Sequence, residues 1–369
     1  MDRPSKAKRS IPPQAETPTS IGRRGVLGAA AAAPFVLSGC ARDKGPPTIG
    51  FASTGGVYND ILRRVWIDDF EKQTGIRVNL SSTTSMAQTK LQTTTDRPQW
   101  DVVELNGPWY VLAVEQGLLL PLDGDIVNLK AFPPEYVRPY GVEYALFNNC
   151  IAWDKRVIGD GLEPSGWADV WDTRKRPGKR SLDTVIGAGT LEMALMADGV
   201  DPEKLYPLDL DRAFRSLDRL GRDNIVWSHS FPETIQRLMS QEVSLASSWP
   251  YRVASANRGG AKLGMNFNQC AVGGDWLCVV KTTRNPQAAF RLINAMISNT
   301  QACAEFSRLT HYGTPNLDSL KLIPKEDADQ VPTSAALSPK LFRPDDNWWA
   351  ANLVRVSTRF KEWQLGMTS

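Results

Sequence analysis

Residues able to carry out catalysis are few in this chain, and their spacing matches no common catalytic motif. The two histidines, His229 and His311, do not form an HExxH arrangement, and there is no GxSxG nucleophile elbow or GxxxxGK phosphate loop. Gly187-Ala188-Gly189-Thr190 lacks the third glycine of a dinucleotide fingerprint. We therefore interpret the chain as a binding protein that is not an enzyme, and we expect neither a metal nor a cofactor.

Cysteines offer a second kind of chemistry. The chain has five, and no CxxC pair supports a zinc site. Apart from Cys40, an even number is left: Cys150, Cys270, Cys278 and Cys303. Disulfides are compatible with an oxidising compartment, and buried free thiols are equally ordinary, so the sequence leaves both states open.

The first forty residues have the organisation of an export signal. A basic stretch ends in Arg23-Arg24, a short apolar run covers Gly28 to Val36, and Leu37-Ser38-Gly39-Cys40 follows. The twin arginine resembles a Tat signal, and the last four residues resemble a bacterial lipobox. These motifs predict a signal peptide over 1–39, lipidation of Cys40, a tether over 40–47, and a periplasmic protein anchored to a membrane by lipid alone.

The basic charge of the whole chain comes from this segment. Six of the 43 Lys/Arg and two of the 40 Asp/Glu lie in residues 1–39, so the remaining chain carries 37 bases and 38 acids. A net charge near −1 gives no indication of a nucleic-acid partner. The length of residues 40–369 suffices for two lobes.

Alternating strand and helix patterns would position any binding residues. Thr48–Phe51 reads as a strand, Tyr58–Thr74 as an amphipathic helix closed by Gly75, and 76–80 as another strand. Further strands are predicted at 101–105, 142–153, 182–186, 225–227, 243–247 and 276–280. Further helices are predicted at 109–116, after a cap at Thr190, at 211–220 and 233–240, from Asn285-Pro286 onward, and at 353–363. The pattern favours an α/β fold with mostly parallel sheets.

From residue 48 onward the chain resembles the spermidine/putrescine-binding branch of the bacterial solute-binding proteins. The segments that carry the resemblance, in the order of that family, are Phe70–Val78, Trp100–Leu105, Gln116–Asp123, Trp167–Asp172, Asn285–Phe290 and Tyr312–Asn316. The resemblance implies a two-lobed fold of the type II periplasmic-binding-protein kind, with a ligand cleft between lobes joined by crossover strands and closure by hinge motion. We expect lobe 1 at 48–148 plus 270–318, and lobe 2 at 149–269 plus 319–369.

The same resemblance implies ligand contacts at strand ends and helix starts that face the cleft. The candidate residues are Ser53, Thr54, Trp109, Tyr110, Glu192, Trp249 and Asp275. Glu192 and Asp275 match acids that the family uses for a polyamine, which needs carboxylates for its ammonium groups and aromatic faces for its methylenes. Gly189 and Gly273 stand where the family has an acid and a tryptophan.

The implied function is capture of a small organic solute, with a polyamine as the first hypothesis, for delivery by a monomer to an ABC permease and its ATPase. Another solute such as a phosphonate, thiamine or a different amine is the main alternative, and an anion would use the Ser53–Gly56 loop and the helix start after it. A carboxylate-dependent hydrolase and an envelope scaffold are the alternatives from other classes.

Overall fold

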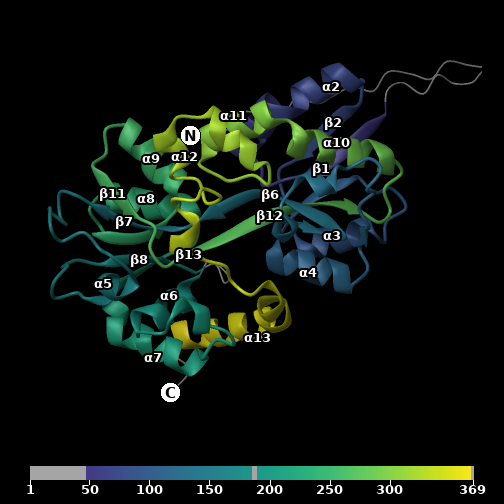
Figure 1. Ribbon diagram of the computed structural model, residues 1–369. Helices are drawn as coiled ribbons and strands as arrows, with labels where there is room; N and C mark the ends of the chain where they lie inside the picture. The colour runs from purple at the N-terminus through teal and green to yellow at the C-terminus, as the bar shows by residue number, and fades with distance from the viewer. Residues whose placement is uncertain (1–46, 185–188, 367–369) are drawn as a thin grey trace, which may run out of the picture. The chain divides into compact units, whose positions relative to one another are not determined.

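Two β-sheets organise the part of the chain that the computed structural model describes, residues 47–184 and 189–366 (Figure 1). The predicted signal segment 1–39, the lipidation site Cys40 and the tether up to residue 46 lie outside the described residues. The first sheet has the order β2-β1-β3-β12-β6-β5, with β4 and β13 paired to β12. The second has the order β11-β7-β10-β8-β9.

The strands of the first sheet are β1 (Thr48–Ala52), β2 (Arg77–Ser81), β3 (Val102–Asn106), β4 (Leu119–Leu120), β5 (Val137–Arg138), β6 (Gly141–Asn148), β12 (Cys270–Val280) and β13 (Leu341–Phe342). Those of the second sheet are β7 (Cys150–Asp154), β8 (Arg180–Asp183), β9 (Ile225–Ser228), β10 (Leu245–Ser248) and β11 (Leu263–Asn266). Both sheets are mixed rather than mostly parallel. The reason is that β7 runs antiparallel to β10 and β11, and β12 runs antiparallel to β3, β4 and β6.

Helices cover both faces of each sheet. On the first sheet, one face carries α1 (Val57–Leu62), a π-helical turn (Arg63–Ile67), α2 (Asp68–Thr74), α10 (Pro286–Ser298) and α11 (Thr300–Thr310), and the other carries α3 (Met86–Gln92) and α4 (Gly107–Glu115). On the second sheet, one face carries α5 (Trp167–Trp171), α6 (Thr190–Ala197), α7 (Leu210–Leu220) and α13 (Asp346–Gln364), and the other carries α8 (Phe231–Met239) and α9 (Pro250–Arg258).

Shorter helices lie in the connections. They are α12 (Lys325–Ala328) and the 3-10 helices Leu129–Ala131, Pro134–Tyr136, Pro202–Lys204, Arg222–Asn224, Leu317–Leu322 and Ser338–Lys340.

The first βαβ unit forms as predicted, with one difference. β1 and β2 pair in parallel, and Gly75 ends the helix in the left-handed conformation, with φ of 71°. The predicted helix from Tyr58 to Thr74 contains the π-helical turn Arg63–Ile67. Val65, Trp66 and Ile67 are all buried there, and three consecutive side chains cannot face one side of a regular α-helix.

Two chain crossings connect the sheets. The predicted long strand over 142–153 is divided at Asn149 into β6 of the first sheet and β7 of the second. The predicted strand 276–280 begins earlier, at Cys270, so β12 forms the return crossing beside β6 (Figure 1). The Asn149 N–H donates to Ala271 O at 3.1 Å, and Asn149 Oδ1 accepts the Ala271 N–H at 2.8 Å. The crossings are therefore fastened together where they pass between sheets.

Helix starts agree with the sequence at Asn285 but not at Thr190. Asn285 precedes α10, and Pro286 is its first residue. The residue before α6 is Gly189, in the left-handed conformation with φ of 92°, and Thr190 is already helical. The prediction of Thr190 as the cap is wrong because its Oγ1 donates instead to the carbonyl oxygen of Asp183, at 2.9 Å.

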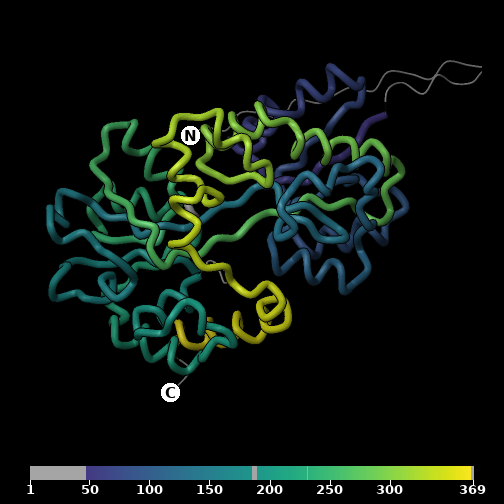
Figure 2. The backbone as a smooth tube through the Cα atoms, viewed as in Figure 1, coloured from purple at the N-terminus to yellow at the C-terminus, as the bar shows by residue number. Residues whose placement is uncertain are grey.

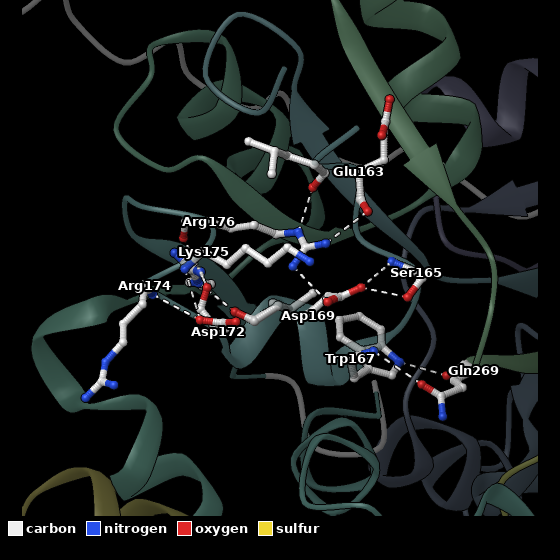
Figure 3. A network of polar contacts seen from close by, with 12 residues as sticks. Glu163, Ser165, Trp167, Asp169, Asp172, Arg174, Lys175, Arg176 and Gln269 are labelled. Carbon is white, nitrogen blue, oxygen red and sulfur yellow. Dashed lines mark hydrogen bonds and ion pairs between the residues drawn. The ribbon is translucent and has the colours of Figure 1, made fainter. Parts of the chain in front are cut away.

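A buried arginine network supports the second crossing (Figure 3). Arg176 donates to the carbonyl oxygens of Leu162 and Glu163 and to Asp169 Oδ1, at 2.6, 3.1 and 2.7 Å. Asp169 lies in the middle of α5. Trp167, the first residue of the same helix, donates its ring N–H to Gln269 O at 2.7 Å. Since Gln269 directly precedes β12, this network fixes the start of the crossing strand.

The C-terminal segment connects with both sheets, and Figure 2 shows its yellow path from α12 past the crossing strands to α13. The 3-10 helix 317–322 and α12 pack against α11, while β13 pairs with β12. Trp349, Val356 and Phe360 of α13 lie in the core of the second sheet, as predicted for a tail helix packed on a lobe.

Candidate ligand-binding site

A pair of acids lies on neighbouring strands of the first sheet. Glu104 on β3 is buried, and Asp275 on β12 is half-buried. In the pairing of these strands Glu104 is opposite Leu277, two residues after Asp275. Burial raises the pKa of Glu104 well above its usual range, and the nearby Asp275 raises it further. Burial also raises the pKa of Asp275, with Glu143 adding to the effect. Two carboxyls held this close are stabilised by a cation.

Hydrogen-bond donors surround Glu104 on both sides. Its Oε2 accepts the N–H of Thr54 at 3.1 Å and the Thr54 hydroxyl at 3.4 Å. Its Oε1 accepts the hydroxyl of Tyr144, whose oxygen is 2.8 Å from that of Tyr58. Tyr58 lies in the first turn of α1, so this network joins the end of β1, the start of α1 and the middle of the sheet.

Aromatic rings continue from this acid pair to the second sheet. Phe147 at the end of β6 lies 5.4 Å from Tyr312, between ring centroids, and 5.4 Å from Trp249. Tyr312 in turn lies 6.3 Å from Tyr58 and 6.4 Å from Tyr251. Trp249 and Tyr251 belong to the start of α9, so the aromatic cluster joins residues of both sheets.

Arg252 adds a positive charge from the second sheet. Its guanidinium carbon lies 5.0 Å from the centroid of the Tyr251 ring, and its Nε is buried without a hydrogen-bond partner among the described residues. Burial and the charge of Asp275 raise the pKa of Tyr312, and Arg252 acts in the opposite direction. Tyr312 is thus within electrostatic reach of both an acid and a guanidinium.

This arrangement can hold an ammonium group and an anionic group at once. The acid pair and the faces of Tyr58, Tyr144 and Tyr312 suit a cation with methylenes. A guanidinium whose buried Nε–H is unused suits a carboxylate, which can accept two parallel hydrogen bonds from it.

Four of the residues predicted from the sequence lie at this cluster. Asp275 and Trp249 are members of it, and Ser53 and Thr54 follow the end of β1 beside Glu104. Trp109 and Tyr110 are elsewhere, on α4, where the Tyr110 ring lies 4.8 Å from that of Trp276 in the core.

Glu192 is bound by residues of its own lobe. Its Oε1 accepts the hydroxyl of Tyr206 at 2.5 Å and the ring N–H of Trp349 at 2.8 Å. Its carboxyl thereby joins α6 to α13, and we leave Glu192 out of the proposed site.

Sequence reasoning missed seven members of the cluster: Tyr58, Glu104, Tyr144, Phe147, Tyr251, Arg252 and Tyr312. Glu104 had a usable signal, because an acid inside the apolar run Val102-Val103-Glu104-Leu105 is costly to bury without a function. The tyrosines, Phe147 and Arg252 had no such signal, since their proximity results from packing between distant segments.

The fold and this cluster between two sheets define a two-lobed solute-binding protein of the periplasmic type. The family model of bacterial extracellular solute-binding proteins matches residues 65–335, and the chain belongs to that family. It is the substrate-binding component of an ABC-type importer for small solutes, and its family and structural neighbours are binding proteins rather than enzymes. Among the described residues, no helix combines the length and apolar character needed to span a bilayer.

Three similar proteins illustrate the family. The gamma-aminobutyric acid-binding protein of Pseudomonas aeruginosa is 30% identical over 322 residues, 84% of this chain and 89% of that protein. Spermidine/putrescine-binding periplasmic protein 1 of Haemophilus influenzae is 28% identical over 272 residues, 70% and 74% of the two chains. The solved Atu4243-GABA receptor is 31% identical, with a TM-score of 0.80 over 86% of this chain and 97% of that one.

Proposed function

We propose that the solute is a small amino acid whose amine and carboxylate are separated by methylenes, as in gamma-aminobutyrate (GABA). The observation that carries this proposal is the acid pair Glu104–Asp275 on lobe 1, with Arg252 on lobe 2 and an aromatic cluster between them. The ammonium binds the acids, the carboxylate binds Arg252, and the methylenes lie against the rings.

Electrostatics favours this orientation. An ammonium beside two carboxyls keeps both ionised, which replaces the hydration that the amine loses. A carboxylate supplies Arg252 with the partner that its buried Nε otherwise lacks. Each end of the solute thereby contacts one lobe, so binding favours closure of the lobes. Two relatives that bind GABA, at 30% and 31% identity, support the same solute class.

A polyamine is the second candidate. The acid pair and the 28% identical spermidine/putrescine-binding relative favour it. Arg252 opposes it, because a second ammonium would lie near a guanidinium. The absence of two clamp residues opposes it too, because Gly189 and Gly273 stand where the polyamine-binding branch has an acid and a tryptophan. A Cβ atom at Gly273 would have only the ring of Phe147 within 4 Å.

A binding experiment separates these candidates. The purified full chain is titrated calorimetrically with GABA and with putrescine, which replaces the carboxylate by an aminomethyl group. Thermal shift with spermidine, thiamine and a phosphonate extends the panel. We expect GABA at 100 times its Kd to add about 2.7 kcal/mol of stability, and putrescine to add much less.

Variants test the two ends of the solute. We expect Asp275→Asn and Arg252→Gln each to weaken GABA binding at least tenfold, since each leaves one charged end of the bound solute without its partner. Arg258→Gln, an exposed arginine at the end of the same helix α9, is the matched control and should leave the affinity unchanged. Strong binding of putrescine that Arg252→Gln does not weaken would replace the amino-acid proposal by the polyamine one.

The proposal also covers the export of the protein, its lipid anchor and the boundaries of its two lobes. We infer Tat-type export and lipidation at Cys40 from residues 23–40, and delivery by a monomer to a permease and its ATPase. Sheet membership supports lobe 1 at 48–148 plus 270–318 and lobe 2 at 149–269. Since α12 packs on α11, we propose that the 319–340 part of the segment first expected in lobe 2 belongs with lobe 1, and that α13 belongs with lobe 2.

A further inference from the structure

The start of α13 makes a contact between the lobes. Asp346, the first residue of this helix, belongs with lobe 2, because Trp349 in the same turn packs in the core of the second sheet. Its carboxylate nevertheless contacts lobe 1, where Oδ2 lies 3.3 Å from Nη2 of Arg138 on β5. The preceding acid, Asp345, is occupied as the cap of the helix, since its side chain accepts the N–H of Trp348. Asp346, rather than Asp345, therefore reaches across to lobe 1.

Lobe 1 surrounds this carboxylate closely. Gly107 begins α4, and a Cβ atom added there would lie 2.0 Å from Asp346 Oδ1. Arg138 is held beside it, because its guanidinium carbon lies 4.3 Å from the centroid of the Trp276 ring and 5.3 Å from that of Tyr110. An acid is favoured both at the start of a helix and beside a guanidinium. Since α13 also packs against α4, the contact extends beyond one ion pair.

A second ion pair strengthens the connection. Arg343, which precedes α13, donates to Glu143 Oε1 of β6 at 2.7 Å. We call Arg138, Glu143, Arg343 and Asp346 the interlobe strap. Two of its members come from lobe 1 and two from the segment that leads into lobe 2. The two acids and two bases compensate one another, so the strap is neutral as a whole.

The strap and the ligand cluster lie on opposite faces of the first sheet. Asp275 shares its face of β12 with Leu277, which packs in the same core as Tyr144. Trp276, between them, points to the other face, where it packs against Tyr110 of α4. Figure 1 agrees, with α11 above the crossing strands and α4 and α13 below them. The strap is therefore behind the site rather than part of it.

Opposite faces respond in opposite ways when the lobes rotate. The crossing strands are bonded to each other at Asn149 and Ala271, where they pass between the sheets, so a hinge rotation pivots there. A rotation that brings Arg252 toward Asp275 on one face moves α13 away from α4 on the other. Closure of the lobes around a solute therefore strains the strap.

We propose that the interlobe strap opposes closure of the lobes, so that its strength limits how tightly the protein binds its solute. The inference rests on the proposed function in placing the solute between the lobes, and it applies to an amino acid and to a polyamine alike. Binding must supply the free energy that separates the strap. A chain with a weakened strap populates the closed, binding-competent state more often, and its apparent affinity rises accordingly.

Two variants release the strap in different ways. Asp346→Asn removes a charge, whereas Gly107→Ala keeps every charge and displaces the Asp346 carboxylate from Arg138. The full chain is titrated calorimetrically with GABA and with putrescine. For the probe that the unaltered chain binds, we expect each variant to raise the affinity at least threefold and to slow dissociation. Asp211→Asn breaks an ion pair of α13 with Arg359 inside lobe 2, and as the matched control it should leave the affinity unchanged.

The sign of the effect separates the strap from a merely structural contact, whose loss would leave the affinity unchanged or lower it. Either of those results in a folded variant overturns the strap and leaves the solute proposal intact. Small-angle X-ray scattering on the solute-free chains needs no ligand, and we expect a smaller radius of gyration in Asp346→Asn and Gly107→Ala than in the unaltered chain. Equal radii overturn the strap as well, whereas failure of both probes to bind overturns the proposed function alone.

Discussion

Among single residues, three buried carboxyl groups differ in the partners that compensate their burial. Glu143, Glu192 and Asp183 are all nearly inaccessible, yet their partners differ. Each has one carboxyl oxygen without a hydrogen-bond partner among the described residues, but Glu143 pairs with Arg343 through its other oxygen, and Glu192 accepts two neutral donors. Burying a carboxyl group costs free energy unless hydrogen-bond donors or a counter-charge compensate it. The partners of a buried acid, rather than its residue type, therefore decide whether its role is structural.

Replacement of Glu192 should lower the stability of the protein rather than its affinity for the solute. Glu192→Ala leaves the Tyr206 hydroxyl and the Trp349 ring N–H without their acceptor, so we expect the free energy of unfolding to fall by about 1–3 kcal/mol. Glu192→Gln keeps an acceptor oxygen and should cost less. Chemical denaturation measures both, and GABA affinity should stay within threefold in the Gln variant. A tenfold loss of affinity there would return Glu192 to the ligand site.

Among the elements, the segment from β13 to the start of α13 joins the lobes. Arg343 donates to Glu143 of β6 at 2.7 Å, and Asp346 lies 3.3 Å from Arg138 of β5. Farther along α13, Trp349 and Phe360 pack in the core of the second sheet. The helix is therefore fixed by its apolar face at one end and by ion pairs at the other.

A pH-dependent loss of stability should follow from breaking the first ion pair. Burial raises the pKa of Glu143, and Arg343 counteracts the rise. Folding then favours the protonated form, so the contribution of Glu143 to stability is present below its ordinary pKa of 4.5 and falls as pH rises through the folded-state value. Arg343→Gln should thus lower Tm more at pH 8 than at pH 5. The exposed Arg355→Gln on α13 is the control, and a pH-independent loss in Arg343→Gln would contradict the argument.

For the molecule as a whole, no described cysteine contributes a cross-link. Cys150, Cys270, Cys278 and Cys303 are free and buried, and burial raises the pKa of each thiol. The two lobes are held instead by the crossing strands and the C-terminal segment. This settles the thiol state that composition left open, because pairing of cysteines depends on distances that the sequence does not contain.

Thiol labelling tests whether the four cysteines are free and buried. We expect Ellman's reagent to leave these four thiols unmodified in the native chain, since buried, protonated thiols react slowly, and to modify them after denaturation. A reducing agent should leave Tm unchanged. Fewer than four newly reactive thiols on unfolding without reductant, or a Tm that falls with it, would indicate a disulfide.

The sequence by itself determined the family, the α/β class and most of the elements, and it predicted Asp275 and Trp249, which the structure places at the candidate site. These features depend on local periodicity, on capping residues such as Gly75 and on short ordered motifs, all of which neighbouring residues specify. Only the tertiary structure brought Glu104, Tyr58, Tyr312 and Arg252 together and separated Glu192 from them. Those contacts join segments as far apart in the chain as Tyr58 and Tyr312, and register and packing between the sheets decide them.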